Sequence, residues 1–185
     1  AVRRKWTIGS FDVSTAYLRG DKQDRELYCR PPKDGLPGVP AEALLKVNTG
    51  VYGLRNAPRL WYLKADRELK ECGWEELATA RSTYVLRDPH TGQVVGMLLM
   101  YVDDACFAGS GPQYETILNK TLDRFNIGKR FINEFDFLGR HVKQFDDFHI
   151  EIDMDKYIAA IEKVVIPAAR RHQPASPLTP LELHN

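Results

Sequence analysis

Three aspartates stand where the sequence could support metal-dependent chemistry. Asp12 lies in an apolar, β-branched segment, and Asp103 and Asp104 are adjacent between two apolar runs. Two neighbouring carboxylates repel each other, and near a core they must be paired or must bind a cation. A surface turn is the alternative, and Asp146-Asp147 near a later hairpin is interpreted in that way. Residue type and spacing alone therefore leave both a cation site and a turn open.

The segments before the aspartate pair predict one long strand and one long helix. An extended segment is expected from Trp6 to Leu18, a Pro- and Gly-rich loop at 30–40, and a short strand at 44–47. Pro58 suits the first turn of a helix that runs to about Cys72 and stops at Gly73. The apolar positions of this helix fall on one face: Trp61, Ala65, Leu69 and Cys72.

A β-hairpin is predicted to carry the aspartate pair. Residues 82–87 and 93–102 are typical of strands joined by a turn at 88–92, and residues 105–108 resume an apolar strand. Ser110 and Gln113 have the form of a capping box for a following helix. The apolar positions of that helix are Ile117, Leu118, Leu122 and Phe125.

The last third predicts a second hairpin and a final helix. The hairpin pairs residues 135–144 with 148–152, and the helix runs from Asp155 to about Ile166, ending at Pro167. Its apolar face holds Tyr157, Ile158, Ile161 and Val165. The order of elements predicts an α+β fold, a split βαβ plan with helices on one face of an antiparallel sheet.

Composition excludes several classes of function. The 185 residues are 43% hydrophobic and 28% charged, with a net charge of +1, which fits an ordinary globular domain. Cys29, Cys72 and Cys106 lie far apart, which favours a reducing compartment and argues against disulfides and a zinc site. No apolar run suits a membrane span or a signal peptide. Scattered histidines and the lack of a Gly-rich phosphate loop argue against hydrolases and ATPases.

Several short motifs, in order along the chain, resemble those of one family. Tyr101-Val102-Asp103-Asp104 is similar to the signature tetrapeptide of retroviral-type reverse transcriptases, and Phe11 to Leu18 resembles their first carboxylate motif. The sequence most closely resembles the copia-type retrotransposon branch. Five further segments carry this resemblance: Glu26–Pro32, Tyr52–Tyr62, Phe137–Gly139, Asp155–Ile158 and Ser176–Leu178.

The resemblance implies two-metal nucleotidyl transfer from deoxynucleoside triphosphates to a primer 3′-hydroxyl. Asp12, Asp103 and Asp104 are then the catalytic carboxylates, and with the Val13 carbonyl they bind two Mg²⁺ or Mn²⁺ ions. In the family, the aromatic residue at the position of Tyr17 packs under the sugar and disfavours a 2′-hydroxyl. The implied nucleotide-binding residues are Thr15, Ala16, Tyr17, Tyr52 and Gly53.

Primer and template contacts follow from the same resemblance. Tyr101 and Val102 are expected to support the primer end, and Phe137, Leu138 and Gly139 open a primer-grip hairpin at about 135–152. Asn56 and Pro58 are expected to face the nascent pair, whereas Trp61 and Leu69 are assigned to the core. Four basic residues flank the expected primer grip: Lys129, Arg130, Arg140 and Lys143.

The chain is expected to be a polymerase palm with the fingers mostly missing, cut from a Gag-Pol-like polyprotein. Residues 1–166 form this palm with partial fingers, and residues 167–185 form an irregular tail. The implied partners are an RNA template, a DNA or tRNA primer, dNTPs, and the ribonuclease H and integrase domains, without a membrane. The implied location is a cytoplasmic virus-like particle, and the nucleus after reverse transcription. Oligomeric state stays open. The alternative is a truncated or co-opted transposon remnant that binds nucleic acid or protein without catalysis.

Overall fold

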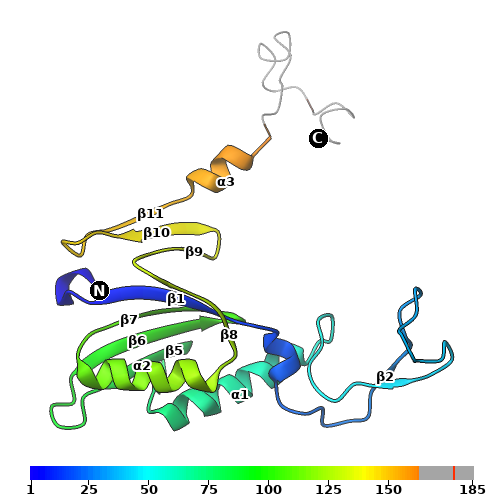
Figure 1. Ribbon diagram of the computed structural model, residues 1–185. Coiled ribbons are helices and arrows are strands. Elements are labelled where there is room, and N and C mark those ends of the chain that lie inside the picture. Colours follow the sequence, from blue (N-terminus) through cyan, green and yellow to red (C-terminus); the bar gives the residue numbers. More distant parts are fainter. Residues whose placement is uncertain (163–176, 178–185) are drawn as a thin grey trace. The chain divides into compact units, whose positions relative to one another are not determined.

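A computed structural model describes residues 1–162 and residue 177 (Figure 1). The chain divides into two compact units, Ala1–Asp153 and Met154–Asn185. The first unit holds a six-stranded, a three-stranded and a two-stranded sheet. The described part of the second unit contains the short helix α3 (Asp155–Ala160). Within the described residues, no helix is long and apolar enough to cross a membrane.

The six-stranded sheet has the order β4-β5-β6-β7-β1-β8, and every neighbouring pair is antiparallel. Since β6 and β1 both pair with β7, they run parallel to each other, and the chain between them contains α1 followed by the strands β4 and β5. In the same way β7 and β8 both pair with β1, and α2 connects them. These are two interlocking split βαβ units. The predicted α+β fold with an antiparallel sheet is therefore confirmed.

The elements are β1 (Thr7–Val13), α1 (Ala57–Cys72), β4 (Glu75–Leu77), β5 (Ala80–Arg87), β6 (Val94–Tyr101), β7 (Asp104–Gly109), α2 (Pro112–Arg124) and β8 (Ile127–Ile132).

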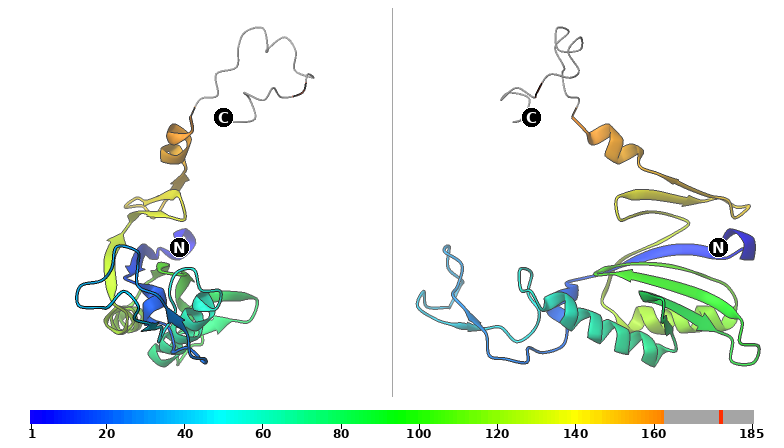
Figure 2. Two further views of the ribbon diagram at one scale, coloured as in Figure 1. Left: turned by 90° about the vertical axis from the view of Figure 1, so that its right-hand side faces the viewer. Right: turned by 180° about the vertical axis from the view of Figure 1, so that it is seen from behind.

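Both long helices lie on the same face of this sheet (Figures 1 and 2). Helix α1 has Pro58 in its first turn and ends at Gly73, whose φ of 117° is left-handed. Its predicted apolar face is confirmed, because all four residues of that face are buried. Burial of this face against the sheet supplies the main driving force for docking α1.

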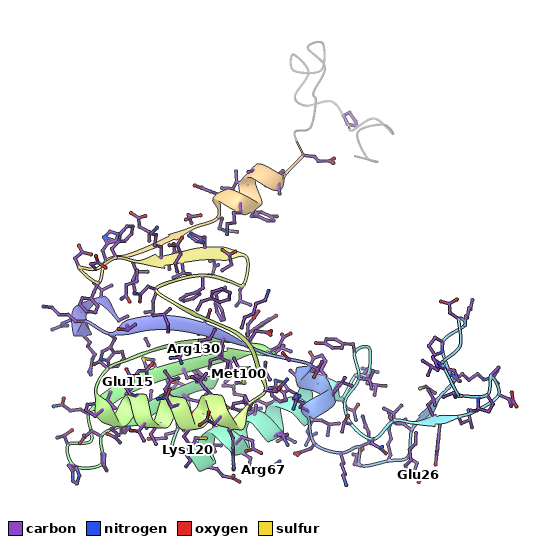
Figure 3. All side chains as sticks on the ribbon, in the orientation of Figure 1. Glu26, Arg67, Met100, Glu115, Lys120 and Arg130 are labelled. Carbon is purple, nitrogen blue, oxygen red and sulfur yellow. The ribbon has the colours of Figure 1, made fainter. Side chains whose placement is uncertain are left out.

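Helix α2 packs beside α1. Leu118 is buried as predicted and Ile117 and Leu122 are partly buried, whereas Phe125 is buried but lies just after the helix, which ends at Arg124. Lys120 donates to the Glu71 carbonyl of α1, with Nζ and O 2.9 Å apart (Figure 3). The predicted capping box is wrong. Gly111, with a φ of 98°, occupies the N-cap. No side chain makes a capping hydrogen bond at this helix start, and the Gln113 amide nitrogen donates to the Arg87 carbonyl at 3.2 Å.

Strand β1 is shorter than predicted, because it ends at Val13 rather than Leu18. Thr15 has a left-handed backbone, with a φ of 57°, and this turns the chain into the 3₁₀ helix η2 (Ala16–Arg19). A second 3₁₀ helix, η1 (Val2–Arg4), precedes β1. The short strand predicted at 44–47 is confirmed as β3 (Leu45–Lys46), paired with β2 (Tyr28–Cys29). Strands β2, β4 and β8 were not predicted.

The second predicted hairpin is a three-stranded sheet. The strand expected over 135–144 is divided by a turn, because Leu138 and Gly139 have φ values of 50° and 76°. The resulting strands are β9 (Glu134–Phe137), β10 (Arg140–Gln144) and β11 (Ile150–Asp153). Asp146 and Asp147 lie exposed in the β10–β11 turn, as interpreted from the sequence. The buried Gln144 side chain joins this sheet to β1, accepting from the Ile8 amide (3.0 Å) and donating to the Trp6 carbonyl (2.9 Å).

The final helix is also shorter than predicted. Helix α3 ends at Ala160, because the backbone of Ile161 is extended, with φ −68° and ψ 120°. Ile161 therefore lies outside the helix, and Tyr157 and Ile158 are exposed. Such a short helix gains little from propensity alone. The predicted end at Ile166 and Pro167, the position of Val165 and, apart from Pro177, the tail at 167–185 lie outside the described residues.

Candidate active site

Two central strands bring the three predicted aspartates together. In the β1–β7 register Asp12 lies directly opposite Asp104. Tyr101 pairs with Asp104 across the β6–β7 hairpin, so Val102 and Asp103 form its two-residue turn. The Val13 amide donates to the Asp103 carbonyl, with N and O 2.7 Å apart. Asp103 is therefore anchored to β1 beside Asp12.

The three carboxylates influence one another electrostatically. Partial burial, and then the charges of Asp103 and Asp12, raise the pKa of Asp104 above its ordinary value. Carboxylate oxygens that repel each other in this way form a donor set that suits a hard divalent cation. As the side chains stand, no group of three His, Cys, Asp or Glu residues in the described part of the chain is arranged to hold a metal ion.

The space around Asp12 depends on a glycine that sequence reasoning missed. Strands β1 and β8 shift register between Asp12 and Val13, and Gly128 lies at this irregularity. A Cβ on Gly128 would lie 2.6 Å from Asp12 Oδ2 and 2.5 Å from Ser14 Oγ. Any other residue at position 128 would therefore displace the Asp12 carboxylate from its observed position. A glycine inside a strand-like run is the sequence signal that could have identified it.

Basic side chains of β8 lie next to the aspartates. Lys129 is the residue opposite Asp12 in the β1–β8 register. Arg130 follows on the same strand (Figure 3), and its guanidinium carbon lies 6.0 Å from the centroid of the Phe107 ring. Both side chains are exposed. Positive charge is therefore available at the edge of the sheet that carries the carboxylates.

The turn that carries Asp103 is strained and is held by a tryptophan. Val102 has a φ of 57°, a position in a two-residue hairpin turn that normally favours glycine. A left-handed backbone costs a β-branched residue about 1–2 kcal/mol. Trp61 Nε1 in α1 donates to the Val102 carbonyl at 2.6 Å. The sequence assigned Trp61 only to the core. A buried indole usually needs an acceptor for its N–H, and that was the available signal.

The predicted nucleotide-binding residues of η2 and of the loop before α1 also meet. The Tyr17 and Tyr52 rings lie with centroids 4.7 Å apart and planes at 56°. Burial, and then the nearby Tyr52, Asp103 and Tyr101, raise the pKa of Tyr17. Three tyrosines and Asp103 therefore gather at one place. Thr15 and Ala16 begin the turn into η2, and Gly53, with a φ of 92°, is exposed beside Tyr52.

A pocket of about 320 Å³ adjoins this group of residues. Its lining includes Tyr17, Pro58, Trp61, Tyr101 and Val102, so it lies between α1 and the turn that carries Asp103. Asn56 has a partner of its own, since its amide donates to the Gln23 side chain at 2.7 Å.

The expected primer-grip residues belong to the other sheet. Phe137 is the last residue of β9, and Leu138 and Gly139 form the β9–β10 turn, where Leu138 is 45% exposed. Of the basic residues expected beside them, Lys143 is engaged in an ion pair with Glu134, with Nζ and Oε2 3.1 Å apart. A role of these residues in primer binding stays a prediction.

Comparison with known proteins agrees with this geometry. A sequence model of the family described as reverse transcriptase (RNA-dependent DNA polymerase) matches residues 1–171. The retrovirus-related Pol polyproteins from transposons RE1 and RE2 of Arabidopsis thaliana are 33% and 30% identical, over 71% and 90% of this chain. That from transposon TNT 1-94 of Nicotiana tabacum is 29% identical over 65% of the chain. The chain spans only 8%, 10% and 9% of these three polyproteins. It therefore belongs to the reverse transcriptase (RNA-dependent DNA polymerase) family, in the copia-type branch found in transposon Pol polyproteins.

Proposed function

We propose that residues 1–166 are the palm of an RNA-directed DNA polymerase that adds dNTPs to a primer 3′-hydroxyl by two-metal nucleotidyl transfer. One observation carries this proposal. The register of β1 and β7 sets Asp12 opposite Asp104, and the β6–β7 turn sets Asp103 beside both. Two acidic side chains on adjacent central strands, with a third in the turn beside them, form a site that suits phosphoryl transfer.

The chain's own residues set the conditions for this chemistry. Asp12, Asp103 and Asp104, together with the Val13 carbonyl, would hold two Mg²⁺ or Mn²⁺ ions. When bound, such ions activate the primer hydroxyl and neutralise the triphosphate. The raised pKa of Asp104 supports this assignment, because a bound cation would offset the repulsion from Asp103 and Asp12.

Tyr17 and Tyr52 select the incoming nucleotide in this proposal. Their rings pack against each other near Asp103, and a ribose 2′-hydroxyl would meet the Tyr17 ring. The amides of Thr15 and Ala16 would face the triphosphate, because successive N–H groups suit an anion. Gly53 places exposed backbone next to Tyr52, within reach of a nucleotide bound there.

An RNA template and a DNA or tRNA primer are the proposed macromolecular ligands. An RNA–DNA hybrid is near A-form and is bound mainly through its backbone and 2′-hydroxyls. Tyr101, Val102 and Pro58 would contact it near the catalytic turn, with Asn56 behind them. Phe137, Leu138 and Gly139 would contact the primer strand. We place the protein with ribonuclease H and integrase domains in a cytoplasmic virus-like particle, and in the nucleus after reverse transcription.

Primer extension tests the proposal. The full-length gene product that contains this chain is assayed on poly(rA)/oligo(dT) with Mg²⁺, alongside Asp103→Asn and Asp146→Asn. Asp146 is the matched control, since it also begins an Asp-Asp pair in a β-hairpin turn but is exposed in the second sheet. We expect extension by the natural protein and by Asp146→Asn, and its loss in Asp103→Asn. Tight hybrid binding without extension by the natural protein would instead identify a remnant that binds nucleic acid without catalysis.

A further inference from the structure

A hydrogen bond links helix α1 to the backbone of the catalytic turn. Trp61 Nε1 donates to the Val102 carbonyl at 2.6 Å. The indole is only 3% exposed and packs edge-on against Phe125, with ring centroids 6.0 Å apart. Its ring position is therefore fixed by the core, so the N–H reaches the turn from a rigid support.

This bond fixes one of the two peptide groups that flank Asp103. The carbonyl of Val102 belongs to the peptide before Asp103, and the carbonyl of Asp103 belongs to the peptide after it. The second carbonyl accepts from the Val13 amide of β1 at 2.7 Å. The first accepts from Trp61. The orientation of the Asp103 side chain depends on both peptide planes, because together they set its φ and ψ.

The turn needs this restraint because its conformation is unfavourable for its sequence. Val102 is β-branched and has a φ of 57°. Releasing this strain requires φ of Val102 to rotate to negative values, which would swing the Val102 carbonyl away from the Trp61 N–H, so the hydrogen bond opposes this rotation. The same rotation would move the Asp103 carboxylate away from Asp12.

We infer that Trp61 is a positioning residue, which holds the strained β6–β7 turn so that the Asp103 carboxylate points at the metal-binding site. The inference rests on the proposed function, in which Asp103 binds the metal ions. Trp61 itself need not touch substrate. It acts through the Val102 carbonyl, which separates its role from the apolar packing of Ala65, Leu69 and Cys72 on the same helix face.

Trp74 offers a closely matched control. It is 2% exposed, and its Nε1 donates to Thr121 Oγ1 at 2.8 Å. Its ring also packs edge-on against another aromatic residue, Tyr114, with centroids 6.4 Å apart. Trp61→Phe and Trp74→Phe therefore each keep an aromatic ring and lose one buried hydrogen bond. Only Trp61→Phe releases the catalytic turn.

Two measurements on the full-length gene product separate positioning from stability. We expect Trp61→Phe to lower kcat for primer extension at least about tenfold more than Trp74→Phe, with KM for dNTP nearly unchanged. The Mg²⁺ concentration for half-maximal thermal stabilisation, which needs no polymerisation, should rise about threefold or more only in Trp61→Phe. Both variants should lose similar thermal stability without Mg²⁺.

A second substitution tests the role of strain. In a Val102→Gly background the left-handed turn carries no penalty, so Trp61→Phe should cost less than in the natural background. Equal losses of kcat in the two tryptophan variants, with equal Mg²⁺ requirements, would overturn the inference. So would an identical effect of Trp61→Phe in both backgrounds. If the natural protein shows no extension, the proposed function fails, and the Mg²⁺ requirements of the two tryptophan variants still decide the positioning role.

Discussion

Gly128→Ala should displace the Asp12 carboxylate without unfolding the protein. The added Cβ would lie 2.6 Å from Asp12 Oδ2 and 2.5 Å from Ser14 Oγ, whereas ordinary contacts are 3.4–4 Å. The carboxylate oxygen must therefore retreat by roughly 0.8 Å, since a rotating side chain yields more easily than a sheet backbone. The movement is directed away from β8, within the group of carboxylates.

The expected cost falls on catalysis rather than on stability. A displacement of about 1 Å at a reacting centre can lower a rate about 100-fold, so we expect kcat to fall about 10- to 100-fold. The backbone of Gly128 is not left-handed, so alanine fits it. Alanine also reduces the entropy of the unfolded chain, which contributes about 0.4–1 kcal/mol and offsets part of the crowding. The Tm should therefore change by no more than about 2 °C.

Primer extension and thermal unfolding, measured on the same preparation of the full-length gene product, test this reasoning. Ser14→Ala removes the other atom that the new Cβ would meet, so the double variant Ser14→Ala, Gly128→Ala distinguishes the two contacts. If Asp12 is the sensitive group, the double variant stays as slow as Gly128→Ala. A kcat within twofold of the natural protein, or recovery in the double variant, would refute the importance of the Asp12 position.

Two further predictions concern stability. The raised pKa of Asp104 means that the folded state holds the proton more tightly than the unfolded state, so stability falls as pH rises from 3.8 through the raised pKa. Asp104→Asn removes this cost, so the Tm of the variant at pH 7 in EDTA should rise by about 1–3 °C. The variant should also lose primer extension. An unchanged or lower Tm would contradict repulsion between Asp104 and the other two carboxylates. Gln144→Ala leaves the Ile8 amide and the Trp6 carbonyl without their side-chain partner, so urea unfolding should show a loss of about 2–4 kcal/mol. A loss below about 0.5 kcal/mol would mean that water replaces both bonds.

The elements predicted best were those whose sequence signals agree with one another. In α1, the helical spacing of apolar residues, Pro58 at the start and Gly73 at the end all indicated the same helix. In the β6–β7 hairpin, two apolar strands enclosed a short acidic turn, and the turn is present but lies at Val102 and Asp103, one residue earlier than predicted. Local sequence was sufficient here because local preference and tertiary packing favour the same structure.

The missed elements depend on contacts that are distant in sequence. Strand β8 is an exposed edge strand with little apolar alternation, and its pairing with β1 defines it. The capping box failed because a left-handed Gly111 is a better entry to α2 than Ser110. The spacing of Trp61 indicated burial but not the acceptor of its N–H, because that acceptor lies on another element.

The topology explains why the carboxylates meet at one end of the central strands. Strands β1 and β6 run parallel, so their carboxyl ends lie at the same edge, with β7 starting between them. Asp12 lies near the end of β1, and Asp103 follows the end of β6. Within the described residues, only two β-branched residues have a left-handed backbone: Val102, which directly follows β6, and Thr15, which lies two residues after the end of β1. Strain of this kind persists only where surrounding contacts impose it. The two strained β-branched residues beside the aspartates therefore indicate that tertiary contacts hold these strand ends in a set geometry.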